Sequence, residues 1–137
     1  MPVVTINDIR TAVFHQLAER FPDVKRYGEE IRQGFEEPCF FVKLLTASQT
    51  QELDIRYMRT HSFDIHYFPA NDSNEDAHAM AEQLYDALEI IEYNGNQYKG
   101  INMSHEIVDG VLHFFVDYNF HVRRIVPDVP KMGSMEQ

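Results

Sequence analysis

Hydrophobic and polar residues alternate most regularly over residues 101–122. Two alternating runs flank Asp109-Gly110, a dipeptide that readily supplies the positive φ angles needed at both central positions of a type I′ turn. A one-residue slip would turn every apolar side chain to the opposite face, so the pattern predicts a tightly specified hairpin. With Val108 opposite Val111, the expected pairs on the apolar face are Ile107 with Leu112, His105 with Phe114, Met103 with Val116 and Ile101 with Tyr118.

Two other stretches have the spacing of amphipathic helices. Thr5 is the expected N-cap of the first helix, with Asp8 as an imperfect capping-box partner, and Pro22 ends it. Apolar residues at helical spacing predict a second helix from about Ser73 to Ile91. Its expected buried stripe consists of Ala77, Met80, Ala81, Leu84 and Leu88.

Shorter runs predict the remaining strands. We expect strands at 24–29, 39–47 and 56–68, a polar projecting loop at 48–53, and a small hairpin that turns at Asn94-Gly95. The strand from Cys39 is unusual, because Phe41 and Leu45 lie on the face opposite Phe40, Val42 and Leu44. An antiparallel sheet with one solvated face should be polar there, so that face is covered either within the subunit or by a neighbour.

The order of these elements is α-β-β-β-α-β-β-β. It predicts an α+β fold in which two helices pack on one face of an antiparallel sheet. We expect one domain over residues 1–126. Residues 127–137 have no periodicity and should form a flexible C-terminal tail.

The composition is that of a globular domain with 137 residues, 44% of them hydrophobic and 25% charged. No apolar run approaches the ~20 residues needed to cross a bilayer, and the first residues lack a signal-peptide pattern. We therefore expect no membrane partner and a protein made in the cytoplasm.

Charge narrows the choice of partners further. Twelve basic residues against 22 acidic ones give a net charge of −10, and no Lys or Arg lies between Arg59 and Lys99. Such a surface repels phosphate and gives little counterion release, which argues against nucleic-acid binding. Four acidic residues of the second helix form either a solvated face or a wall past which DNA slides: Glu75, Glu82, Asp86 and Glu89.

Seven histidines raise the question of a metal site. Asp64 and His66, about 7 Å apart on one strand face, would need a third ligand from a neighbouring strand. His113, Asp117 and His121 follow one another at about 13 Å, too far apart to ligate one ion. We therefore expect no metal site, and interpret these residues as a polar sheet face stabilised by cross-strand pairs such as Glu106 with His113.

Signatures of catalysis are missing from the sequence. It contains no phosphate-binding glycine loop, no HExxH and no GxSxG, and the lone Cys39 precedes an apolar strand, where a thiol is buried and inert. We expect neither an enzyme nor a bound cofactor.

Three blocks resemble a phage tail terminator family of Gram-positive phages and prophages. They are GEEIRQGFEEPCFFVKLL at 28–45, SFDIHYFP at 62–69 and NMSHEIVDGVLHFFVDYNFHV at 102–122. The resemblance implies a ring, typically a hexamer, that caps the head-proximal end of the tail tube, stops its polymerisation and joins head-completion proteins. It thus implies a virion-tail protein whose partners are its own copies, the tail tube protein and a head-completion protein.

An apolar outer strand face and a projecting loop fit such a ring, in which one surface patch meets a different patch on the neighbour. The interface residues that we expect are Phe41, Lys43, Leu45, Gln49, Gln51 and Arg56. Two other functions stay open at this point: a generic oligomeric adaptor and a metal-dependent hydrolase.

Overall fold

The computed structural model describes residues 4–28, 36–53, 56–70 and 73–123. The expected tail at 127–137 lies outside these residues. Within them the elements follow in the predicted order, and the α+β class is confirmed. They are α1 (Ile6–Arg20), β1 (Lys25–Tyr27), β2 (Cys39–Leu53), β3 (Arg56–Phe68), α2 (Asn74–Ala87), β4 (Ile90–Tyr93), β5 (Asn96–Val108) and β6 (Val111–Arg123).

The six strands form one sheet in the order β1-β2-β3-β6-β5-β4. Four of the pairings in this sheet are antiparallel, as expected, and β1 in addition pairs parallel to β2. The physical reason is the length of the connection. Residues 28–38 separate the two strands, a connection much longer than the short turn of a hairpin between antiparallel strands.

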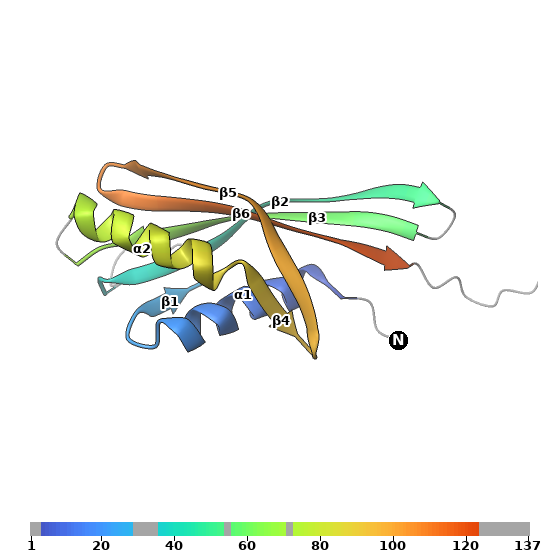
Figure 1. Cartoon of the computed structure of the whole chain (residues 1–137), viewed down its shortest axis with the longest axis horizontal. Helices are drawn as coiled ribbons and strands as arrows, with labels where there is room; N and C mark the ends of the chain where they lie inside the picture. The colour runs from blue at the N-terminus through green and yellow to red at the C-terminus, as the bar shows by residue number, and fades with distance from the viewer. Residues whose placement is uncertain (1–3, 29–35, 54–55, 71–72, 124–137) are drawn as a thin grey trace, which may run out of the picture.

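Both helices lie against the same face of the sheet (Figure 1). There the apolar faces of α1 and α2 close a single core over the central strands β2, β3 and β6. Its largest fully buried side chains include Phe40, Phe63, Phe114 and Tyr118.

The start of each helix is as expected. Thr5 caps α1 with a full capping box, in which the Thr5 N–H donates to Asp8 Oδ2 at 2.9 Å and the Asp8 N–H donates to Thr5 Oγ1 at 3.1 Å. Ser73 caps α2. Neither helix is long and apolar enough to cross a membrane.

The end of α2 differs from the prediction. The helix stops at Ala87, and Ile91 is a buried residue of β4 instead of the last helical residue. The reason is the expected Asn94-Gly95 turn, whose φ angles of 51° and 82° fold β4 back onto β5. Pairing between these two strands takes residues that helical periodicity alone assigns to α2.

The prediction of a loop at 48–53 was also wrong. β2 continues through Leu53 and pairs with β3 almost to the turn. Periodicity cannot identify this segment as a strand because residues 48–51 are all polar and exposed, with no apolar face. The paired ends of β2 and β3, together with the end of β6, project beyond the helices (Figure 1).

The main hairpin has the predicted register only near its turn. Asp109 and Gly110 have φ angles of 52° and 78°, and the expected pairs hold from Val108 with Val111 back to Ser104 with Phe115. Beyond that point, Gly100 and not Ile101 lies opposite Tyr118.

A β-bulge causes this shift, since two residues of β5, Asn102 and Met103, share the space opposite Val116. Asn102 has a φ of 54°, and its amide donates to Asp117 Oδ2 at 3.0 Å. On the N-terminal side of the bulge, β5 bends away from β6 and pairs with β4 beside α1 (Figure 1).

Candidate functional site

The face of the sheet opposite the helices carries the residues that suggested an interface. Phe41 is only 6% exposed, because its ring packs on Tyr27 at 5.2 Å and on Phe68 at 5.3 Å between centroids. Leu45, in contrast, is 45% exposed. The expected apolar patch is therefore half closed within the subunit, and Leu45 is its exposed member.

Leu45 also marks a bulge in β2. Leu44 pairs with Phe63 and Thr46 with Ser62, which leaves Leu45 as the extra residue. The extra residue shifts the alternation of β2 by one, so odd-numbered residues past the bulge lie on the opposite face from Phe41 and Lys43. Gln49, opposite Arg59, therefore points to the side of the sheet where the helices lie. Gln51 lies on that same side, whereas Lys43 lies on the outer side opposite Asp64. The expected interface residues therefore lie on both faces of the sheet, with Phe41 and Lys43 before the bulge and the others on the projection beyond it.

We call this projection the arm and define it as residues 45–53 of β2 with 56–62 of β3. Side chains at 45–50 are all exposed. In the described part of the chain, β1 pairs only with residues 39–41 of β2, so the backbone edge from residue 42 to residue 50 has no strand beside it. A long open edge of this kind can pair with a strand of another chain.

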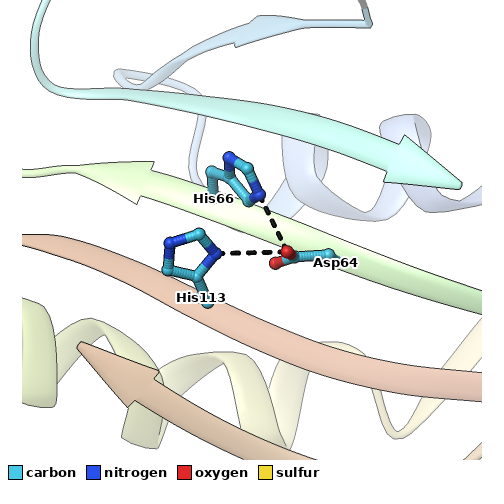
Figure 2. Close-up of side chains that lie close together, drawn as sticks. All are labelled: Asp64, His66 and His113. Atoms are coloured by element: carbon cyan, nitrogen blue, oxygen red, sulfur yellow. Dashed lines mark hydrogen bonds and ion pairs between the residues drawn. The ribbon is translucent and has the colours of Figure 1, made fainter. Parts of the chain in front are cut away.

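Three side chains converge on the outer face, beside the base of the arm. Asp64 and His66 come from β3 and His113 from β6, where His113 lies directly opposite His66. Asp64 Oδ2 is 2.8 Å from His66 Nε2 and 3.1 Å from His113 Nδ1 (Figure 2). The sequence indicated Asp64 and His66 and the need for a ligand from a neighbouring strand. His113 could not be chosen without the β3–β6 register.

The Asp64 carboxylate is held in its charged form. Burial would raise the pKa of Asp64, but hydrogen bonds from His66 and His113, with the charges on these rings, lower it below its usual value. The oxygen Oδ1 of the same carboxylate is buried and has no hydrogen-bond partner within the described residues. One oxygen is therefore saturated and the other is not.

His105 lies opposite Phe114 on the apolar face of the main hairpin, as expected. It is hydrogen-bonded, with Nδ1 at 2.9 Å from Tyr85 Oη and Nε2 at 3.4 Å from His78 Nδ1. Its side chain is only half-buried, at the edge of the core. It faces α2 and takes no part in the cluster on the outer face.

The sequence profile of the phage tail terminator proteins matches residues 8–130. This chain belongs to the phage tail terminator family. The tail terminator is a structural protein of the virion tail, as the resemblance implied. No curated protein sequence matches the chain.

Two solved structures are similar to this chain. One is a chain from the virion of a native gene transfer agent particle, 15% identical, covering 85% of this chain and 96% of its own length with a TM-score of 0.55. Another solved chain, also 15% identical, covers 90% of this chain and 99% of its own length, at a TM-score of 0.48.

The acidic residues of the tail terminator lie on its surface. Glu75 and Glu82 are exposed on α2, and Glu89 is exposed just after the helix, which ends earlier than predicted. Asp86 forms an ion pair with Arg20 of α1. Three of the four expected acidic positions therefore lie on α2, and one of them is already paired within the subunit.

Proposed function

We propose that this tail terminator assembles into a ring of identical subunits, six in number, on the head-proximal end of the tail tube. The ring ends polymerisation of the tube and offers its other side to a head-completion protein. Membership of the family over residues 8–130 supports the role in the tail. The exposed arm is the structural feature that supports the assembly of subunits.

The arm is weakly stabilised in an isolated subunit. Its side chains at 45–50 are exposed on both faces, so little apolar burial stabilises it there. Burial against a neighbour would provide the missing contacts, and the open edge of β2 at 42–50 would supply backbone hydrogen bonds. A contact between the arm of one subunit and a different surface of the next is heterologous, which is the kind of contact that closes a ring.

The charge of the subunit fits a ring through which DNA travels. A net charge of −10 and the exposed carboxylates of Glu75, Glu82 and Glu89 repel phosphate. In this proposal DNA passes the ring without binding to it, and the ring recognises proteins only. The protein acts through association and catalyses no reaction.

Light scattering over a range of concentrations, followed by electron microscopy with isolated tail tubes, tests the proposal. We expect rings or caps at one end of the tubes. Leu45→Asp should reduce this assembly, because it places a charge on the exposed apolar side chain of the arm. Ile90→Asp is the matched control, since Ile90 is 46% exposed but lies on β4, away from the arm.

Both variants should keep the melting temperature of the unmodified subunit, because both side chains are exposed. A protein that stays monomeric alone and with tubes contradicts the ring. Unimpaired assembly of Leu45→Asp contradicts the role of the arm.

A further inference from the structure

We propose that Asp64, His66 and His113 form a binding site for one divalent transition-metal ion, with zinc as the best-suited ion. The three side chains offer one carboxylate oxygen and two imidazole nitrogens, and these ligand atoms all lie within 4.8 Å of one another. Two imidazoles and a carboxylate are a ligand set that zinc and related ions use in proteins. The site goes beyond the assembly role proposed above and does not depend on it.

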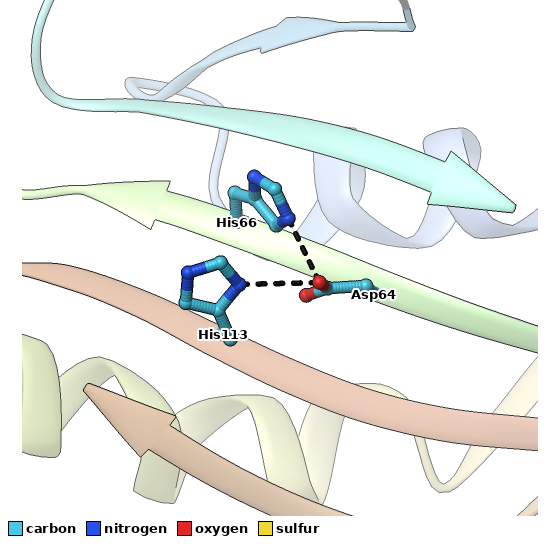
Figure 3. Close-up of polar contacts among 3 residues, drawn as sticks. All are labelled: Asp64, His66 and His113. Atoms are coloured by element: carbon cyan, nitrogen blue, oxygen red, sulfur yellow. Dashed lines mark hydrogen bonds and ion pairs between the residues drawn. The ribbon is translucent and has the colours of Figure 1, made fainter. Parts of the chain in front are cut away.

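The spacing of the ligand atoms is close to what an ion needs. A tetrahedral zinc ion with bonds of about 2.0–2.1 Å holds its ligand atoms about 3.3 Å apart. The distances from Asp64 Oδ2 to the nitrogens of His66 and His113 are 2.8 and 3.1 Å, so each ring needs to separate from the carboxylate by only a few tenths of an ångström (Figure 3). The two ring nitrogens lie within 4.8 Å of each other, and an ion would hold them at about 3.3 Å. Each ring would then present a lone pair to the ion, by releasing its proton or moving it to the other ring nitrogen.

The backbone holds these ligands in place. His66 and His113 are direct partners in the antiparallel β3–β6 ladder, and their ring centroids are 4.3 Å apart. Asp64 lies two residues from His66 on the same face of β3. Both strands are central in the sheet, so the ligands lie on the rigid part of the subunit.

The site is open to solvent and has unused coordinating capacity. The side chains of His66 and His113 are 19% and 24% exposed, so an ion can enter from the outer face. The second Asp64 oxygen, Oδ1, is buried without a hydrogen-bond partner among the described residues, and a cation would satisfy it. With three protein ligands, a fourth position is left for water or for a side chain of another molecule.

Two charged residues flank the cluster with opposite effects. Glu106 of β5 lies directly opposite His113, and its carboxylate favours a cation nearby. Lys43 of β2 lies directly opposite Asp64, and its ammonium opposes one. His66 has Phe41 opposite it on β2, which brings no charge. This arrangement makes Lys43 a useful probe, because it is exposed and lies beside the site without being a ligand.

The test uses untagged protein that has been stripped with a chelator and then titrated with Zn²⁺ by calorimetry and with Co²⁺ by visible absorption. We expect one ion per chain, a Co²⁺ spectrum of tetrahedral nitrogen and oxygen ligation, and a higher melting temperature with Zn²⁺. His66→Gln, His113→Gln and Asp64→Asn should each weaken binding by at least about tenfold.

His78→Ala is the matched control, because His78 forms a close histidine pair with His105 on the other side of the sheet. Its affinity for Zn²⁺ should equal that of the unmodified chain. Lys43→Gln should bind about threefold more tightly, since a like charge is removed from an exposed position beside the ion. This variant keeps the proposal testable even if a ligand variant fails to fold.

Less than one ion bound per chain, or full affinity in the folded His66→Gln and His113→Gln variants, would overturn the site. Loss of binding in His78→Ala would also overturn it, because the ion would then lie between α2 and β5. An unchanged affinity in Lys43→Gln would place the ion away from Asp64.

Discussion

Gly100 occupies the tightest position that the fold imposes on β5. It is buried opposite Tyr118, just where the strand leaves the main sheet for β4, and its N–H donates to the Glu89 carbonyl at 2.7 Å. A Cβ atom at this position would lie 2.6 Å from the Leu88 carbonyl oxygen and 2.9 Å from Val116 Cγ2. Gly100→Ala therefore forces the backbone of one of two packed segments to move.

The loss of stability in Gly100→Ala can be estimated from the contacts that the new Cβ atom disturbs. Overpacking a core usually costs about 1–3 kcal/mol. The Leu88 carbonyl also accepts the buried Tyr118 hydroxyl at 2.7 Å, and disturbing that bond adds about 1–2 kcal/mol. Replacing glycine also lowers the conformational entropy of the unfolded chain, which stabilises the folded state by about 0.4–1 kcal/mol. We expect a net loss of about 2–4 kcal/mol, a large part of the stability of an ordinary domain.

Urea unfolding followed by circular dichroism measures this loss, and a thermal scan should show a fall in melting temperature of about 6–20 °C. Gly95→Ala is the control. Gly95 has a φ of 82° but no atom within 4 Å of its added Cβ, so only backbone strain of about 1–2 kcal/mol applies.

A double-mutant cycle with Tyr118→Phe separates the two terms. Both changes act on the Leu88 carbonyl. The double variant should therefore lose less free energy of unfolding than the sum of the losses in the two single variants. A loss below about 0.5 kcal/mol in Gly100→Ala would refute the reasoning, because surface substitutions without consequence fall in that range.

Three further predictions concern other parts of the chain. Gly110→Val should destabilise the subunit by about 1–3 kcal/mol in urea unfolding, because Gly110 has a φ of 78°, whereas Ser104→Val on the exposed face of the same hairpin should be nearly neutral. Cys39 should resist thiol reagents until the chain unfolds, since the side chain is buried and burial raises its pKa to about 11. The free energy of unfolding should fall as pH rises from about 9 to 11, because only the thiol of the unfolded chain ionises in that range. Cys39→Ala should remove this fall. Replacing all four acidic residues by Gln should leave the melting temperature unchanged or slightly higher. The four residues are Glu75, Glu82, Asp86 and Glu89. If they line the lumen of the ring, the variant should retain DNA in otherwise normal tails; if they face solvent, infectivity should not change. A variant that fails to assemble would place these carboxylates in a subunit interface.

Local signals in the sequence predicted much of the fold. The capping box at Thr5 and the turns at Asn94-Gly95 and Asp109-Gly110 are specified by a few adjacent residues, and each is present. The bounds of β3 were also predictable, because its alternation is regular and Pro69 follows it. Each of these features depends on backbone preferences that act within a few residues.

Features that depend on distant contacts were missed. The bulge at Asn102 has no strong local signal, and two residues before it Gly100 packs closely against the Leu88 carbonyl, a contact that also depends on the tertiary fold. The polar strand at 48–53 is stabilised by pairing with β3, which the alternation of its own residues does not reveal. The cluster on the outer face has the same origin, because His113 joins Asp64 and His66 only through the β3–β6 register.

The two bulges divide the sheet into parts with different tasks. Between them lies the section of β2, β3, β5 and β6 that packs on both helices and that carries Asp64, His66 and His113. Past Leu45, β2 becomes part of the exposed arm. On the N-terminal side of the Asn102 bulge, residues 96–99 of β5 pair with β4 beside α1. A bulge changes the direction of one strand without interrupting its neighbours. In the proposed ring, the arm can therefore change in sequence to suit a neighbouring subunit while the core and the outer-face cluster keep their register.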